Sequence, residues 1–151
     1  MTALVVGVGN RVRRDDGVGP EVADRVRDAR PDLDVVEVSG DASTLLDLWA
    51  GHDLAVVVDA VRTGAPVGTC HRWELLAGEW DVVPPAARVS SHLVGVLDAV
   101  EFARALDRLP VRLVVVGVEV VELGVGPGLS EPVAAAVDVA VGLVGEVLAT
   151  A

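Results

Sequence analysis

Two aspartate positions and one histidine stand out as residues that could carry chemistry. Asp15 and Asp16 lie in a glycine-containing loop, Asp59 follows a run of three valines, and His92 follows two serines at the expected start of a helix. Carboxylate oxygens and a neutral imidazole nitrogen bind divalent ions such as nickel or zinc, and three protein ligands leave positions open for water or substrate. Asp16, Asp59 and His92 therefore form a candidate open metal site, with Asp15 as the alternative to Asp16.

Each of these residues also has a purely structural interpretation. Asp16 could cap the helix expected to begin near Gly19–Pro20, and His92 could be a polar residue of a first helical turn. Asp59 is harder to explain in this way, because a buried aspartate is costly unless it is paired or bound to a metal. The competing histidines are His52, expected at the opposite sheet edge, and His71, expected in the middle of a strand.

The charge composition excludes several functions. The chain has 23 acidic residues and 12 cationic ones, for a net charge of -11, and every cationic residue is an arginine. Without lysine there is no Walker-type phosphate loop, no Schiff base and no pyridoxal anchor. The strongly negative charge argues against a nucleic-acid partner, which normally meets a basic surface. We therefore expect no nucleic-acid partner.

Two other ligand-binding patterns fail at particular residues. The loop beginning Gly7-Val8-Gly9-Asn10 resembles the start of a dinucleotide-binding fingerprint, but Val12 stands where the third glycine is required. Asp15 and Asp16 would also repel a pyrophosphate. A phosphorylation-receiver interpretation fits the acidic pair and Asp59, but the lysine that it requires on the fifth strand is missing.

The elements that must position these residues alternate between strand and helix. Apolar, valine-rich runs are typical of strands that are buried on both faces. We expect strands at Ala3–Val8, Leu33–Val38, Leu54–Val61, Gly68–Glu74 and Val111–Glu119. We expect a loop at Gly9–Gly19 and helices at Pro20–Ala29, from Asp41 or Ser43 to Trp49, from Ser90 or Ser91 to Leu106, and from Ser130 to Leu148.

This order predicts a single α/β domain over residues 1–151. It is a three-layer sandwich with a mostly parallel five-stranded sheet, one antiparallel strand and helices on both faces. The antiparallel strand follows from Arg62–Val67, a connection too short for a parallel crossover and therefore predicted to close a hairpin. In such sheets ligands bind outside the carboxyl ends of the strands, the edge where Asp16, Asp59 and His92 are expected.

The remaining features bear on location and on the substrate. Apolar stretches are broken by Asp138 and Glu146, no signal peptide is visible, and the single Cys70 can form no internal disulfide. We therefore expect a cytoplasmic protein without membrane contact. Leu75–Val89 lacks periodicity, as functional loops often do, and could bind a substrate tail. Its Trp80 is expected to be partly in the core.

Taken together, these motifs resemble the hydrogenase maturation proteases, the endopeptidases of nickel-iron hydrogenase assembly. The resemblance covers nearly the whole chain, and the glycine–asparagine–acid block is its most specific part. The matching segments are Gly7-Val8-Gly9-Asn10, Asp15-Asp16-Gly17-Val18-Gly19, Val56-Val57-Val58-Asp59-Ala60 with Gly68-Thr69, Ser91-His92 and Gly128-Leu129-Ser130.

The resemblance implies an enzyme that removes the C-terminal extension of a hydrogenase large-subunit precursor after nickel insertion. The family's metal-contacting positions fall on Asp16, Asp59 and His92, which would contact nickel supplied by the precursor. The first position is often glutamate in the family and is aspartate here. A family pattern of aspartate, paired glycines and threonine is replaced by Ser39-Gly40-Asp41-Ala42, a departure that bears on how the precursor is gripped.

Two other functions remain open on the sequence alone. One is a non-catalytic assembly factor of the same fold that binds nickel-loaded precursor without releasing a peptide. The other is a small-ligand or nucleotide-binding α/β domain that uses the Gly7–Gly9 turn. In that case, neutral substitutions at Asp16 or Asp59 would strengthen ligand binding.

Overall fold

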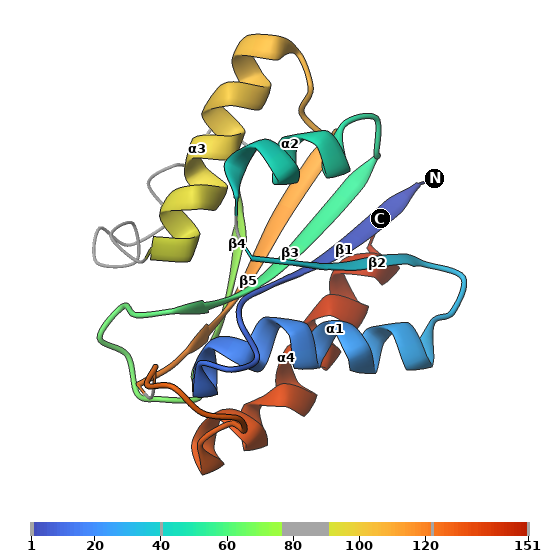
Figure 1. Cartoon of the computed structure of the whole chain (residues 1–151). Helices are drawn as coiled ribbons and strands as arrows, with labels where there is room; N and C mark the ends of the chain where they lie inside the picture. The colour runs from blue at the N-terminus through green and yellow to red at the C-terminus, as the bar shows by residue number, and fades with distance from the viewer. Residues whose placement is uncertain (1, 40, 77–90, 122, 151) are drawn as a thin grey trace.

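Five strands form one twisted sheet at the centre of the molecule (Figure 1). The computed structural model describes residues 2–39, 41–76, 91–121 and 123–150, and Ser91 and His92 by their backbone alone. The sheet order is β2-β1-β3-β5-β4. The strands are β1 (Ala3–Val8), β2 (Asp34–Val38), β3 (Leu54–Val61), β4 (Cys70–Glu74) and β5 (Arg112–Glu119). All neighbouring pairs are parallel except β4 with β5, which confirms the predicted mostly parallel sheet.

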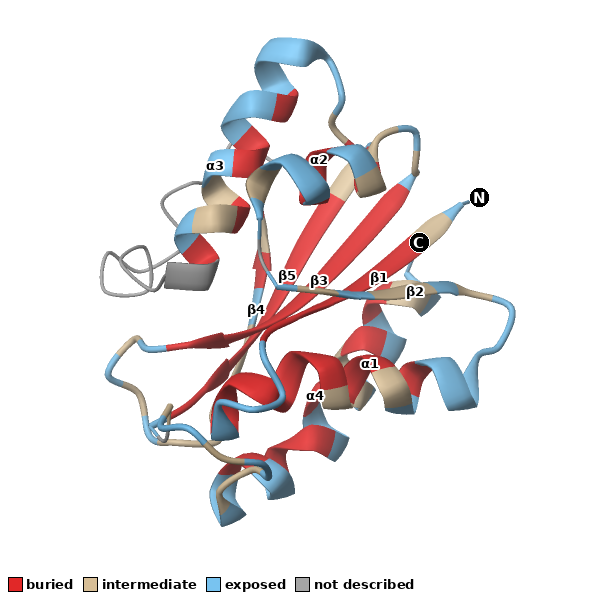
Figure 2. Cartoon of the chain, in the orientation of Figure 1, coloured by how far each residue is buried: buried red, intermediate tan, exposed pale blue. Residues whose placement is uncertain are grey.

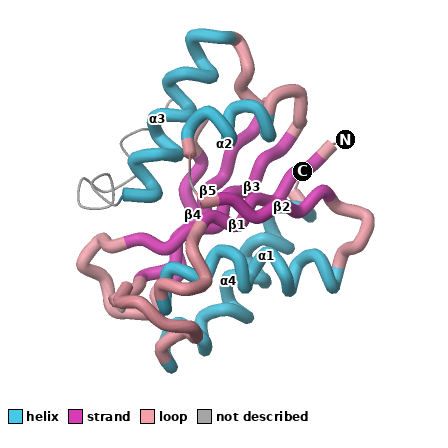
Figure 3. Tube along the Cα trace, viewed as in Figure 1, coloured by secondary structure: helices cyan, strands magenta, loops and turns pink. Residues whose placement is uncertain are grey.

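Helices cover both faces of this sheet (Figure 3). α2 (Ala42–Trp49) and α3 (Ser91–Leu106) pack on one face, while α1 (Val18–Ala29) and α4 (Glu131–Ala149) pack on the other. The carboxylate of Asp41 caps α2 by accepting hydrogen bonds from the N–H groups of Ser43 and Thr44. The predicted three-layer architecture is therefore confirmed.

The central strands are buried on both faces, as their valine-rich sequences predict (Figure 2). All eight residues of β3 are buried. Val57 packs in the apolar cluster beneath α2 and α3, and Val58 in the cluster beneath α1 and α4. The core is thus two layers of Val, Leu and Ala, separated by the sheet.

α4 has the length and apolar composition of a membrane-crossing helix, which by itself is weak evidence of a membrane span. Its inward residues Val133, Val137 and Val144 are buried in the same cluster as the side chains of α1 and β5. The outward Asp138 forms an ion pair with Arg25 of α1 at 3.0 Å. α4 therefore packs as the core helix of this fold.

Two local predictions are wrong. The turn after β3 does reverse the chain, but β4 pairs with β5, which lies between β3 and β4, so no hairpin forms. The segment Gly9–Gly19 is not loop throughout, because a short 3-10 helix spans Arg14–Gly17 and α1 already begins at Val18. A single turn closed by local hydrogen bonds has no hydrophobic periodicity to reveal it. The segment predicted to bind a substrate tail, with Trp80, lies largely outside the described residues.

Candidate active site at the carboxyl edge of the sheet

The site forms where the sheet order reverses. The chain passes from β1 to β2 on one side, and β3 lies on the other side of β1, so the carboxyl ends of β1 and β3 flank the switch point, where sheets of this kind have a ligand-binding crevice. The ladder between these strands ends at Gly7 and Val58, so Asp59 is the next residue of β3. Asp16 lies on the loop that leaves β1 at this point. Both carboxylates are therefore supplied to the crevice by adjacent strands.

Two glycines allow this loop to lie directly on the strand ends. Gly9 has φ +152°, and a Cβ there would lie 1.9 Å from the carbonyl oxygen of Asp16. A Cβ on Gly19 would lie 2.4 Å from the carbonyl oxygen of Val8 and 2.6 Å from that of Val58. Such approaches are open only to glycine, so these residues set the short distance between the loop and β3.

Asp15 and Asp16 are both buried but make different contacts. Asp15 Oδ1 accepts the backbone N–H of Ser130 at 2.7 Å, and its Oδ2 accepts the Ser130 hydroxyl at 2.9 Å and the N–H of Val121 at 3.4 Å. Asp15 therefore fastens the loop between β5 and α4. Asp16 Oδ2 instead accepts the N–H of Asn10 at 3.0 Å within its own loop.

The interpretation of Asp16 as a helix cap is wrong. Gly17 is the residue before the first turn of α1, and no side chain caps that helix. Asp15 is engaged by Ser130 and Val121 and Asp16 by Asn10, so the choice of Asp16 as the ligand stays a prediction.

Asp59 is fully buried within β3. The helix start carrying His92 lies at the same edge, because α3 ends beside the amino end of β5 (Figure 1). The His92 side chain lies outside what the structure describes. Among the described side chains, no group of three or more His, Cys, Asp or Glu residues is placed to hold a metal ion. The three-ligand set therefore stays a prediction that depends on His92.

A second polar cluster at this edge was missed by the sequence analysis. Because β4 is antiparallel, its first residues lie at the carboxyl ends of the parallel strands, so His71 is at the edge and not in mid-strand as predicted. Its Nε2 lies 3.0 Å from Oε1 of Glu119, which is buried at the end of β5. The carboxylate of Glu119 also accepts the N–H of Thr63 at 2.9 and 3.1 Å and the Thr63 hydroxyl.

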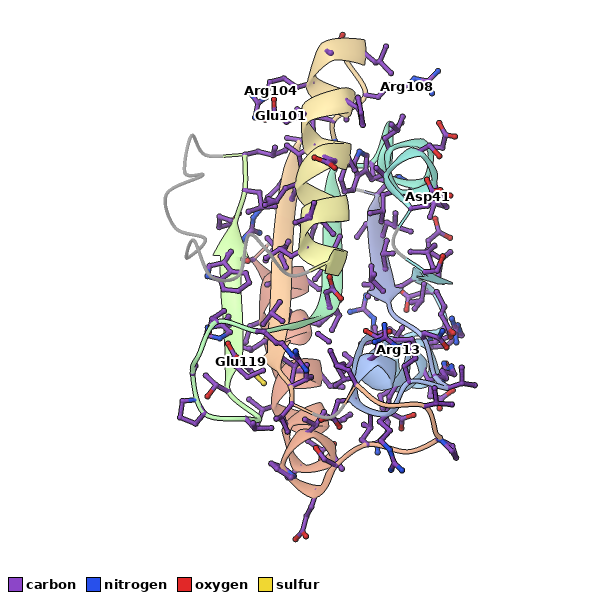
Figure 4. All side chains as sticks on the ribbon, turned by 60° about the vertical axis from the view of Figure 1, so that its left-hand side comes forward. Arg13, Asp41, Glu101, Arg104, Arg108 and Glu119 are labelled. Atoms are coloured by element: carbon purple, nitrogen blue, oxygen red, sulfur yellow. The ribbon has the colours of Figure 1, made fainter. Side chains whose placement is uncertain are left out.

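The signal that could have revealed this cluster was the direction of the fourth strand. A strand predicted to run backwards presents its beginning at the functional edge. Figure 4 shows Glu119 and Arg13 at the same end of the sheet, opposite the end where Arg104 and Arg108 lie.

Arginine anchors the loop after β1. Arg11 donates to Glu37 of β2 at 2.6 Å and to Asp24 of α1 at 2.8 Å, and hydrogen bonding to Glu37 raises the pKa of its guanidinium. These partners come from two different elements, so the loop that carries Asp16 is held from both sides. Arg13 donates to the carbonyl oxygen of Leu123 and joins this loop to the one after β5.

Cys70 does not belong to the crevice. Its side chain packs against the core cluster beneath α1 and α4, 3.8 Å from the carbonyl oxygen of Ala136, while the next residue, His71, points to the opposite face. Burial raises the pKa of the Cys70 thiol, which disfavours the nucleophilic thiolate. This agrees with the expectation that Cys70 and His71 form no nucleophile pair.

Known proteins of one family match the sequence and the fold. The family model of the hydrogenase maturation protease HycI matches residues 20–147. The hydrogenase expression/formation protein HupD of Thiocapsa roseopersicina is 28% identical in an alignment of 148 positions that covers 91% of this chain and 65% of that protein. A protein of Methanocaldococcus jannaschii named as a hydrogenase maturation protease is 30% identical over 148 residues, 93% of this chain and 92% of that one. The chain thus spans just under two thirds of the HupD protein's length.

Solved structures agree with this assignment. The hydrogenase maturating endopeptidase HybD of Escherichia coli matches with a TM-score of 0.80 and 26% identity, covering 99% of this chain and 93% of that chain. The nickel-iron hydrogenase maturation protease HybD of Thermococcus kodakarensis matches with a TM-score of 0.81 and 25% identity, covering 97% and 99%. The chain therefore belongs to the hydrogenase maturation protease family.

Proposed function

We propose that this protein is the endopeptidase that removes the C-terminal extension of a nickel-iron hydrogenase large-subunit precursor after nickel insertion. The family match over residues 20–147 is the observation that carries the proposal. The buried Asp16 and Asp59 at the crevice between β1 and β3 support it, because that is where a sheet of this kind binds its ligand.

In this proposal nickel arrives with the precursor and is not held permanently by the enzyme. Asp16, Asp59 and His92 contact it, and their two carboxylates and one imidazole are donors suited to a divalent ion of this type. The ion then marks a precursor that is ready for cleavage. The partner is the large-subunit precursor, and the reaction takes place in the cytoplasm. The segment Leu75–Val89 binds the C-terminal tail of the precursor.

Peptide hydrolysis requires a base that takes a proton from the attacking water. Cys70 is unsuited as a nucleophile, because its thiol is partly buried on the far face of β4 and its pKa is raised. We therefore propose direct attack by water, without a covalent intermediate on the enzyme.

The test is to incubate the purified protein with nickel-loaded and with nickel-free precursor and to measure the precursor mass. We expect loss of a C-terminal peptide from the nickel-loaded form alone. If neither form is shortened, the proposed activity is wrong, and binding without cleavage would instead identify an assembly factor.

Matched variants test the site in the same assay. Asp16→Ala, Asp59→Ala and His92→Ala should lose cleavage. His52→Ala and Asp53→Ala, which change a histidine and an aspartate at the opposite sheet edge, should retain it. If all three site variants cleave normally, the proposed ligand set is wrong even if the protease activity is real.

A further inference from the structure

The cluster of Thr63, His71 and Glu119 is built like the support of a catalytic imidazole. The side chain of Glu119 is only 3% exposed, whereas that of His71 is 20% exposed. His71 Nε2 lies 3.0 Å from Oε1 of Glu119, and when that carboxylate is ionised it can only accept, so Nε2 then carries the hydrogen and donates. Thr63 holds the same carboxylate through its N–H and its hydroxyl. Glu119 therefore fixes both the ring orientation and the tautomer of His71.

In that tautomer the lone pair of His71 lies on Nδ1. Within the described part of the chain no hydrogen bond to Nδ1 is found, and the His71 side chain is 20% exposed. A neutral imidazole with one nitrogen held by a carboxylate and the other open to water is the arrangement that general-base catalysis uses.

His71 also faces the same space as Asp59. Asp59 is in register with Gly117 on β5, and Gly117 is in register with His71 on β4, so all three lie in one row and project to the same face of the sheet. Two strand spacings of roughly 4.8 Å place the Cα atoms of Asp59 and His71 about 10 Å apart.

Apolar side chains cover Gly117, the residue between Asp59 and His71 in this row. A Cβ on Gly117 would lie 2.9 Å from Cζ3 of Trp73 and 3.0 Å from Cγ2 of Val61. The Trp73 ring also stacks on the His71 imidazole, with centroids 4.9 Å apart and an angle of 11° between the planes. The Trp73 ring thus packs against the face of the imidazole, while Glu119 contacts its Nε2.

We propose that His71 is the general base of this peptidase and that Glu119 is its positioning residue. His71 Nδ1 accepts a proton from water as the water oxygen bonds to the scissile carbonyl carbon. The resulting imidazolium then returns the proton to the departing nitrogen as the C–N bond breaks, which leaves one carboxyl and one amino product. This step rests on the proposed function, because it requires the precursor as substrate.

His71 could instead have a purely structural role, because the contacts among Thr63, His71 and Glu119 also hold the turn after β3 against β4 and β5. Single-turnover cleavage of nickel-loaded precursor by His71→Ala, with and without added imidazole, separates the two. We expect the cleavage rate constant to fall about 10²- to 10⁴-fold, with the KM for precursor within about threefold of wild type. Free imidazole should restore part of the rate, which a lost structural contact would not allow.

Further variants complete the test. Glu119→Gln should lower the rate constant roughly tenfold or more, without rescue by imidazole, because the amide no longer selects the Nε2–H tautomer. If His71→Ala does not fold, His71→Gln replaces it, since its amide nitrogen can still donate to Glu119. His52→Ala, a histidine at the opposite sheet edge, is the matched control and should cleave at the wild-type rate.

The outcomes keep this step apart from the overall function. Wild-type protein that does not cleave overturns the proposed function, and the role of His71 with it. If the wild-type protein cleaves and a folded His71→Ala or His71→Gln variant is equally active, only the proposed role of His71 is overturned. An inactive His71→Ala variant that imidazole does not rescue assigns the cluster to structure and also overturns the proposal.

Discussion

The two ends of the sheet both carry carboxylates, but these are buried at one end and exposed at the other. At the carboxyl end, Asp15, Asp16, Asp59 and Glu119 are buried, and they are the buried polar residues of the described chain. At the amino end, the Asp53 carboxylate is exposed, although hydrogen bonding to the N–H of Thr2 lowers its pKa. Burial of a carboxylate costs free energy unless partners offset it, whereas an exposed one remains solvated.

Cavity size does not separate the two ends. A hollow of about 360 Å³ at the amino end is lined by Thr2, Arg30 and Asp34 among others, and one of about 350 Å³ at the carboxyl end lies between the loop after β1 and β2. The difference lies in the buried acids. Asp15 is held by Ser130 and Val121, and we infer that Asp16, Asp59 and Glu119 are kept buried at this edge for catalysis.

The largest expected effect is a difference in cleavage rate between two variants that each remove one carboxylate charge, one at each end of the sheet. Asp59→Asn keeps the shape of the side chain and should lower precursor cleavage roughly 10³-fold, as expected for loss of a group that acts on the reacting centre. Asp53→Asn should leave cleavage within about twofold of wild type. The cleavage rates of the two variants are measured by mass spectrometry, after circular dichroism has shown that both are folded like the wild type. Equal losses at both ends would contradict the functional difference between them.

The next effect separates two neighbours at the carboxyl end. Asp16→Asn should lower cleavage about 10²-fold. Asp15→Asn should mainly lower stability, by about 2 kcal/mol, because a buried carboxylate that accepts three hydrogen bonds from Ser130 and Val121 is replaced by an amide.

Urea unfolding and cleavage assays of both proteins measure the two effects separately. If Asp15→Asn is stable but inactive while Asp16→Asn remains active, the two aspartates exchange roles, and Asp15 becomes the ligand.

A smaller effect tests how the loop is placed. Gly19→Ala puts a Cβ 2.4 Å from the carbonyl oxygen of Val8 and 2.6 Å from that of Val58, so the start of α1, with the loop before it, must move away from β1 and β3. We expect a loss of about 1–3 kcal/mol from overpacking, together with reduced cleavage. Gly51→Ala is the comparison at the amino end: its φ of +80° strains an alanine too, but a Cβ there meets no atom within 4 Å. A Gly19→Ala variant as active as Gly51→Ala would show that loop placement is unimportant.

The sequence predicts the elements well, because buried parallel strands are continuous apolar runs and helix starts carry recognisable caps. The bounds of β1 and β3 were predicted correctly, and Asp41, one of the two residues proposed to cap α2, is its cap. The pairing partner of β4 was not, because the short turn after β3 fixes only the direction of the chain. The choice between β3 and β5 depends on long-range packing that no local pattern contains.

The candidate site was predictable only in part, for the same reason. Loop and strand-end positions of Asp16 and Asp59 follow from the order of elements, and the resemblance to a family selects them. The contact between His71 and Glu119 joins residues 48 positions apart in the chain. It forms because β5 lies beside an antiparallel strand, so its detection needed the sheet order as well as the sequence.

The smallest expected effect concerns the two faces of one strand at the active edge. Cys70 is adjacent to His71 but packs toward α4, and burial raises the pKa of its thiol. At a given alkaline pH a smaller fraction is therefore thiolate, so iodoacetamide should modify folded protein more slowly than protein in denaturant. Because the unfolded thiol loses its proton first as pH rises, the Cys70 thiol stabilises the fold below the ordinary thiol pKa. This stabilisation is lost as pH rises through the raised pKa of the folded protein.

Cys70→Ala should cleave precursor within about twofold of wild type, since only the opposite face of β4 meets the crevice. An inactive but folded Cys70→Ala variant would place chemistry on both faces of β4 and contradict the separation that the strand's alternation implies.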